Sequence, residues 1–176
     1  MSKDNFSIKK SIEILESTPS VLKGLLKGKS ESWTLNNEGK DTWSPVQVLR
    51  HLILAEINNW IPRIEIILSN EHDKTYIPFE RQEKVFREQS ITELLAEFTV
   101  YRIINIKKLK SKNITKADFN KTAIHPEFGE VTLSQQISTW CVHDLGHISQ
   151  ICRVMAFQYK NEIGPWEKYL SIVKTK

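Results

Sequence analysis

The chain has 176 residues, a formal net charge of +4 with neutral histidines, and 40% hydrophobic residues. This length predicts a single domain, residues 1–176, with a core of its own. The mild charge and scattered lysines argue against a nucleic-acid partner, and no apolar run approaches the length of a membrane span. The N-terminal residues are charged and amphipathic, unlike a signal peptide.

The two cysteines indicate a reducing compartment. Cys141 and Cys152 fall on one predicted helix, about 16 Å apart along its axis, which is too far for a disulfide bond. We therefore expect a reduced, cytoplasmic protein.

The first predicted helix runs from about Ser7 to Leu26, where apolar residues recur at helical spacing. Pro19 should either bend this helix or split it into two pieces. Residues 28–41 are polar and predict a loop, in which Trp33 and Leu35 are expected to pack onto the rest of the protein.

The second predicted helix covers Val46–Leu68 and should be the most buried, because it is apolar on several sides. Ser44 is a good N-cap, and Pro45 suits the first helical position. Pro62 should kink the helix. His51 lies near the start of this helix and points toward its buried side.

A long charged connection, Asn70–Gln89, follows and suits a crossover along a helical bundle. Ser90 and Glu93 form a capping-box pattern that opens a third helix, which ends near Leu109. A second long connection, Lys112–Glu130, is expected to be irregular apart from a turn.

The fourth predicted helix, residues 131–159, opens with the capping-box pair Thr132 and Gln135. The sequence Gly164-Pro165-Trp166 then breaks the chain. Residues Glu167–Lys174 predict a short terminal helix.

His143 and His147 are four residues apart in the fourth helix, so both project from one face, at the border of its apolar arc. Two histidines at this spacing can bind one metal ion, although metal-free surface or core histidines give the same pattern. With His51 on a second helix, three imidazoles would meet in the bundle core. Such a ligand set leaves positions open for solvent or substrate.

Asp144 projects about 100° from His143 on the helical wheel, into the apolar arc. A buried carboxylate is costly unless it has hydrogen-bond partners. Asp144 could hold a ligand histidine by its second nitrogen, or it could tie the helix to a neighbour. We favour the structural role, because its carboxylate should face a neighbouring helix.

Motifs in order along nearly the whole chain match a known family. They are Trp43-Ser44-Pro45, Arg50-His51-Leu52 with Glu56, His125-Pro126 with Gly129, the block from His143 to Ile151, and Gly164-Pro165-Trp166. Together they resemble the DinB-like (DinB/YfiT) superfamily. The resemblance implies an all-α four-helix bundle in up-down-down-up order, with long connections and parallel second and third helices. It also implies one divalent ion held by His51, His143 and His147.

Characterised members of that family include transferases and isomerases that use low-molecular-weight thiols such as bacillithiol, mycothiol or glutathione. The resemblance therefore implies a metal-dependent enzyme on small molecules, such as a thiol S-transferase or a hydrolase. Three imidazoles suit zinc, nickel, iron, cobalt or manganese to differing degrees. The candidates for residues beside the site are Asp144, Glu56, Gln136, Trp140 and Gln150.

Two alternatives remain open at this point. The chain could be a non-catalytic, metal-binding stress or scaffold protein acting as a homodimer, which is also the assembly that we expect for the enzyme. It could also be a metal-independent bundle in which the histidines are core residues.

Overall fold

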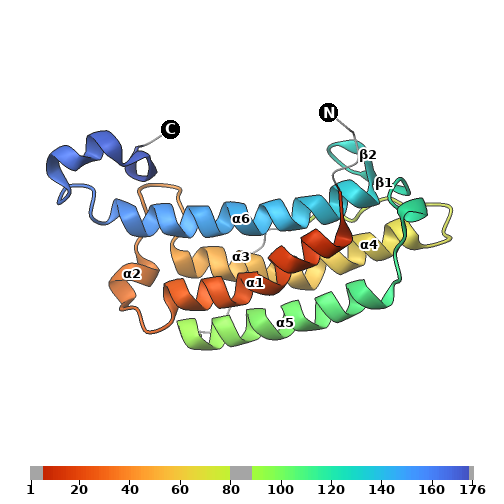
Figure 1. The fold of residues 1–176 in the computed structure, drawn as a ribbon, viewed down its shortest axis with the longest axis horizontal. Coiled ribbons are helices and arrows are strands. Elements are labelled where there is room, and N and C mark those ends of the chain that lie inside the picture. Colours follow the sequence, from red (N-terminus) through yellow and green to blue (C-terminus); the bar gives the residue numbers. More distant parts are fainter. Residues whose placement is uncertain (1–5, 80–88, 175–176) are drawn as a thin grey trace.

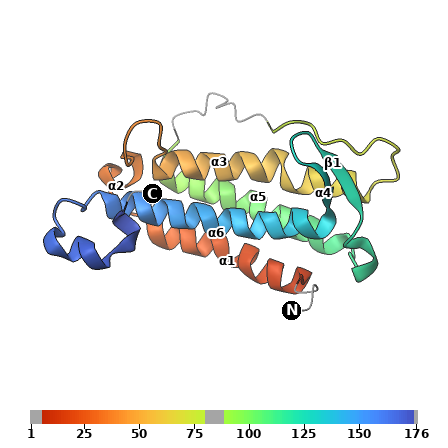
Figure 2. The ribbon, with the colours of Figure 1, turned by 90° about the horizontal axis from the view of Figure 1, so that it is seen from above.

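Four helical rods run side by side in a computed structural model that describes residues 6–79 and 89–174 (Figure 1). The rods are α1 (Ile8–Leu26), α3 (Pro45–Asn58) continued by α4 (Trp60–Leu68), α5 (Ile91–Ser111) and α6 (Leu133–Phe157). Rods α1 and α6 run one way, whereas α3–α4 and α5 run the other way. Each of α1 and α3–α4 packs against both α5 and α6 (Figure 2). The predicted four-helix bundle in up-down-down-up order is therefore confirmed.

Capping boxes start three of the long helices at the predicted residues. In each box, the hydroxyl of the cap residue accepts a hydrogen bond from the backbone amide of the third helical residue. The side chain of that third residue accepts a hydrogen bond from the backbone amide of the cap residue. The pairs are Ser44 with Gln47, Ser90 with Glu93, and Thr132 with Gln135. These bonds satisfy amides that a helix start would otherwise leave unpaired.

The two prolines within helices have different effects. The kink expected from Pro62 is present as an interruption at Asn59, where α3 ends and α4 begins. In contrast, α1 stays one helix around Pro19. Proline has no N–H to donate to the Leu15 carbonyl one turn earlier. Arg102 of α5 donates to that carbonyl instead, with 2.9 Å between Nη1 and the oxygen.

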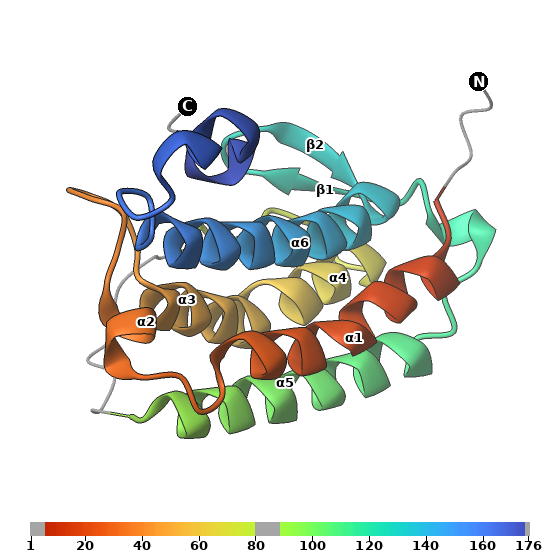
Figure 3. The same cartoon turned by 60° about the vertical axis from the view of Figure 1, so that its left-hand side comes forward.

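The second connection is more ordered than the sequence predicts. It contains a 3-10 turn, η1 (Lys116–Asp118), and an antiparallel hairpin of β1 (Thr122–His125) and β2 (Gly129–Thr132). The hairpin lies against α4 and α6 (Figure 3). Strands of four residues give too short an alternating pattern for sequence analysis to detect.

The crossover from α4 to α5 is hydrogen-bonded to this hairpin. The Tyr76 amide donates to the Ile124 carbonyl at 2.9 Å, and the Ile124 amide donates to the Lys74 carbonyl at 2.8 Å. The two connections therefore form one continuous wall. Residues 80–88 of the predicted crossover lie outside the described residues.

Two smaller predictions are corrected. The predicted loop at residues 28–41 contains a helical turn, α2 (Glu31–Leu35), which turns Thr34 inward and leaves Leu35 54% exposed. Trp33 does pack as expected, against Tyr159, with ring centroids 5.3 Å apart.

The predicted terminal α-helix is also corrected. Residues after Ile163 form the 3-10 turns η2 (Gly164–Tyr169) and η3 (Ser171–Val173). Val173 is the buried residue of these two turns. So little apolar contact does not stabilise a short α-helix.

Arg102 is the centre of a buried ionic network that reaches all four rods. Its guanidinium donates to Asp144 of α6, with 3.0 Å from Nη2 to Oδ1, and to Glu56 of α3, with 2.8 Å from Nη2 to Oε1. The Thr18 hydroxyl of α1 donates to Asp144 at 2.7 Å. Arg102 is 1% exposed and Asp144 is fully buried. Asp144 thus ties helices together, as expected.

Glu56 carries the remaining bonds of this network. Asn105 donates to its Oε2 at 3.0 Å, and the Trp140 indole donates to its Oε1 at 3.0 Å. Burial raises the pKa of Glu56, although the charge of Arg102 opposes that change. Burial disfavours the charged form of Arg102 too, but the Asp144 and Glu56 carboxylates outweigh it and raise the pKa of Arg102.

The apolar core forms two clusters. One includes Leu15, Trp60 and Trp140, and the other includes Leu22 and Phe98. None of the helices in the described ranges is both long and apolar enough to cross a bilayer.

Candidate metal centre

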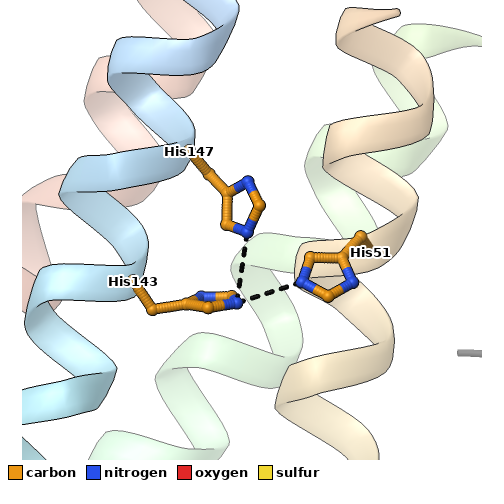
Figure 4. A group of neighbouring side chains, drawn as sticks. All are labelled: His51, His143 and His147. Atoms are coloured by element: carbon orange, nitrogen blue, oxygen red, sulfur yellow. Dashed lines mark hydrogen bonds between the residues drawn. The ribbon is translucent and has the colours of Figure 1, made fainter. Parts of the chain in front are cut away.

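Three histidine side chains from two rods meet at one point. His51 projects from α3, and His143 and His147 project from α6 toward it (Figure 4). The Nε2 atom of His143 lies 3.0 Å from Nε2 of His51 and 3.2 Å from Nε2 of His147. One ligand atom from each of the three histidines lies within 4.8 Å of the other two. The convergence expected from the sequence is therefore present.

These distances fit the ligand spacing around a metal ion. An ion about 2.0–2.1 Å from each nitrogen, with angles of about 90° to 110°, holds adjacent nitrogens about 2.9–3.4 Å apart. Both separations, 3.0 and 3.2 Å, fall in that range. One proton on His143 Nε2 could serve only one of its two neighbours, so a shared cation matches this arrangement better than hydrogen bonding does.

The surroundings keep two of these imidazoles neutral, as metal ligands must be. Burial, and then the neighbouring His147 and His51, lower the pKa of His143 to about 3. Burial also lowers the pKa of His147, against a smaller opposite effect of its hydrogen bond to Gln150.

Two different contacts hold the rings on α6. The Nδ1 atom of His147 lies 2.9 Å from Gln150 Oε1, an oxygen that can only accept, so Nδ1 carries the proton and Nε2 is free to bind a cation. The Nδ1 atom of His143 is buried without a partner among the described residues. The His143 and Trp60 rings instead meet in a T-shaped contact, with centroids 5.0 Å apart.

An open cavity of about 770 Å³ lies beside the histidines. Rods α3–α4 and α6 form one side of it, and the connections add Phe79 and the hairpin turn from His125 to Phe128. Aromatic rings surround the metal-binding end. Trp43 stacks parallel to His147, with centroids 6.3 Å apart, and Phe79 meets His51 edge-on at 5.9 Å.

The other candidate residues from the sequence occupy three different places. Gln136 lines the cavity, and Gln150 contacts His147. Glu56, Trp140 and Asp144 do not line the cavity. They belong to the Arg102 network inside the bundle, where Arg102 bonds to both carboxylates and the Trp140 indole bonds to Glu56. Among the described residues, the two carboxylates bond to Arg102, Thr18, Asn105 and Trp140, and not to His143 or His147.

Three further residues that the sequence patterns do not indicate also line the cavity: Asn59, Trp60 and Arg63. On an ideal helix, Asn59 and Arg63 project about 80° and 120° away from His51, so helical periodicity does not place them on the same wall. The interruption at Asn59 also separates Arg63 on α4 from His51 on α3.

Comparisons with known proteins agree with this fold. The family model of the DinB superfamily matches residues 14–151. A protein of Oceanobacillus iheyensis named "Putative metal-dependent hydrolase" is 26% identical over 161 residues, covering 85% of this chain and 88% of that protein. The solved structure of YfiT from Bacillus subtilis is described as "a probable metal-dependent hydrolase with an unusual four-helix bundle topology". It matches with a TM-score of 0.70 and 18% identity, covering 93% of each chain, which supports the fold.

Proposed function

Because this chain belongs to the DinB superfamily, we propose that it is a metal-dependent enzyme acting on a small molecule. The observation that carries the proposal is the convergence of three imidazole nitrogens beside an open cavity. Three protein ligands leave coordination positions for water or substrate, which is typical of catalytic sites and not of structural ones.

When bound, a divalent ion lowers the pKa of a coordinated water or thiol, which provides a nucleophile at neutral pH. The chain's own residues have separate roles. His51, His143 and His147 would hold the ion, and Gln150 fixes the orientation of His147. Glu127 is the one carboxylate among the described cavity-lining residues and is our candidate for proton transfer.

Two reactions fit this arrangement. The thiol S-transferase inferred from the family resemblance would use a low-molecular-weight thiol as the nucleophile, with an electrophile in the cavity. Hydrolysis, in which water takes the place of the thiol, is favoured by the descriptions of the two relatives. We propose the S-transferase first and the hydrolase second. Zinc, nickel, iron, cobalt and manganese all suit three imidazoles.

The proposed setting is the cytoplasm, where two free thiols stay reduced, and the proposed assembly is a homodimer. Light scattering on the purified protein would measure the mass of the assembly. A monomer mass at micromolar concentration would reject the dimer without affecting the metal site.

The metal site is tested by measuring bound metal in purified variants. His51→Ala, His143→Ala and His147→Ala should each lose stoichiometric metal, because each removes one of three ligands. The matched control is His72→Ala, since His72 is exposed and lies outside the cluster. Unchanged metal content in His143→Ala would contradict the proposal.

The reaction is tested with the cobalt-substituted protein. Added bacillithiol or glutathione should produce a thiolate-to-cobalt charge-transfer band, and thiol transfer to a chloronitrobenzene should follow. Turnover of activated esters without any effect of thiol would favour the hydrolase. Metal binding with neither reaction would favour the non-catalytic alternative.

A further inference from the structure

Arg63 is a cation of the cavity wall that has no anionic partner among the residues that the structure describes. Its side chain is half-buried and lines the cavity. Its guanidinium carbon lies 4.7 Å from the centroid of the Tyr76 ring, so an aromatic face holds it in place. Within residues 6–79 and 89–174, its N–H groups form no hydrogen bond or ion pair. They are therefore available to a molecule in the cavity.

His125 contacts the same Tyr76 ring and offers a second N–H donor. The rings of His125 and Tyr76 meet edge-on, with centroids 5.9 Å apart. The amides of Glu127 and Phe128 donate to Nδ1 of His125 at 3.1 and 3.3 Å. A neutral imidazole whose Nδ1 accepts carries its proton on Nε2. Burial and the nearby Arg63 lower the pKa of His125, so the ring is neutral at pH 7.

Two more N–H groups in this wall are unpaired. The Trp60 indole Nε1 and the Gln136 amide Nε2 are buried and have no hydrogen-bond partner among the described residues. Gln136 uses its oxygen to accept from the Tyr76 hydroxyl, at 3.3 Å, which leaves its nitrogen as the free end. Buried polar groups without partners are rare in folded proteins, and ligands often satisfy them.

From this arrangement we infer that the wall formed by Arg63, His125, Trp60 and Gln136 binds a carboxylate of the substrate. A guanidinium pairs with a carboxylate through two parallel N–H···O bonds, and neutral N–H donors can complete the oxyanion's bonds. The inference rests on the proposed function, because it assigns a substrate class, small organic carboxylates, to the same cavity. The carboxylate would bind at Arg63 while the reacting thiol or electrophile lies near the histidines.

The remaining charges of the cavity permit an anion. Glu127 is the only acidic side chain among the described lining residues, and it is exposed on the hairpin turn. A divalent ion and Arg63 together exceed its single negative charge. An anionic substrate is therefore favoured over a cationic one.

The test compares 3-mercaptopropionate with 3-mercaptopropionamide, which has the same shape but no charge. Both are titrated into the cobalt-substituted protein, and the thiolate charge-transfer band gives each affinity. The acid should bind the wild type about tenfold or more tightly than the amide. In Arg63→Gln, this preference should fall to the small difference in affinity that the two thiol groups cause by themselves. The affinity of the amide should be unchanged. Arg63→Lys should retain part of the preference.

A matched charge control is Lys107→Gln, on the exposed face of α5, which should keep the wild-type preference. Because both ligands are titrated into each protein, comparing the acid-to-amide affinity ratio between proteins cancels the difference between the thiol groups of the two ligands. The inference is overturned if Arg63→Gln retains the wild-type preference for the acid, or if the wild type shows none. In either case the metal-dependent enzyme would still stand.

A second measurement tests the carboxylate site without relying on bound metal. In the metal-free protein, the ¹H–¹⁵N signal of the Trp60 indole, assigned with Trp60→Phe, should shift with propionate and not with propionamide. Arg63→Gln should abolish that shift. If the protein holds no metal, the proposed function fails, and a lack of any saturable shift with propionate then overturns the carboxylate site as well.

Discussion

At the scale of single residues, Gln150 decides which nitrogen of His147 is free. Its side-chain oxygen accepts from Nδ1, so the Nε2 lone pair points to the cluster. Partners of this kind fix the ring of a metal-binding histidine and raise its basicity. Nδ1 of His143 has no such partner among the described residues, so the site depends more strongly on Gln150.

We therefore predict that Gln150→Leu weakens metal binding by about ten- to a hundredfold, because the His147 ring loses its fixed tautomer. Competition with a chromogenic chelator measures the affinity. The control is Gln158→Leu, because Gln158 lies at the end of α6 and bonds to the Trp33 carbonyl. Equal affinities in wild type and Gln150→Leu would exclude a role in orientation.

At the scale of helices, Arg102 stabilises the arrangement of all four rods. It neutralises carboxylates from α3 and α6, and its bond to the Leu15 carbonyl fills the gap that Pro19 leaves in α1. Two carboxylates share one guanidinium, so the network contains one more negative charge than positive charge.

This imbalance predicts unequal losses of stability. Asp144→Asn leaves Arg102 and Glu56 as a balanced pair and should lower the free energy of unfolding by about 1–3 kcal/mol. Arg102→Met strands two buried carboxylates and should cost about 3–5 kcal/mol. Both losses should appear in urea denaturation with and without metal.

The control for this pair is Arg153→Met, which breaks the partly exposed pair with Glu38 and should cost about 1 kcal/mol or less. If Asp144→Asn instead lowered metal affinity without changing apo stability, Asp144 would serve the histidines and not the bundle.

At the scale of the whole molecule, the neutral histidines make the metal-free protein sensitive to acid. The pKa of His143 is lowered to about 3 from an ordinary value of 6.5. Between these values the unfolded chain binds a proton that the folded chain does not. Stability is therefore lost as the pH falls through this window, by up to about 1.4 kcal/mol per pH unit for each such histidine.

Urea denaturation in chelator at several pH values between about 6.5 and 4.5 checks this prediction. His143→Leu should show a shallower loss of stability with acid than the wild type, whereas the exposed-site variant His72→Ala should match the wild type. Identical slopes in wild type and His143→Leu would contradict a buried neutral His143.

The long helices could be predicted because their signals are local. Capping pairs and apolar periods fix where α5 and α6 start, and they place Asp144 in a buried arc. The partner of Asp144 could not be named, because Arg102 lies 42 residues away and follows the apolar period of its own helix. The hairpin and Arg63 depend on the same kind of distant contact, which periodicity does not contain.

The connections that wall the cavity also make it open to redesign. The histidines and the Arg102 network stand on the rods, whereas Phe79 and the hairpin turn belong to connections outside them. Substrate preference can therefore be altered by grafting connections from relatives onto an unchanged bundle. The backbone bonds between Tyr76, Ile124 and Lys74 join the two connections, so a successful graft has to transplant both together. Moving the hairpin alone would leave amides and carbonyls of the crossover unpaired.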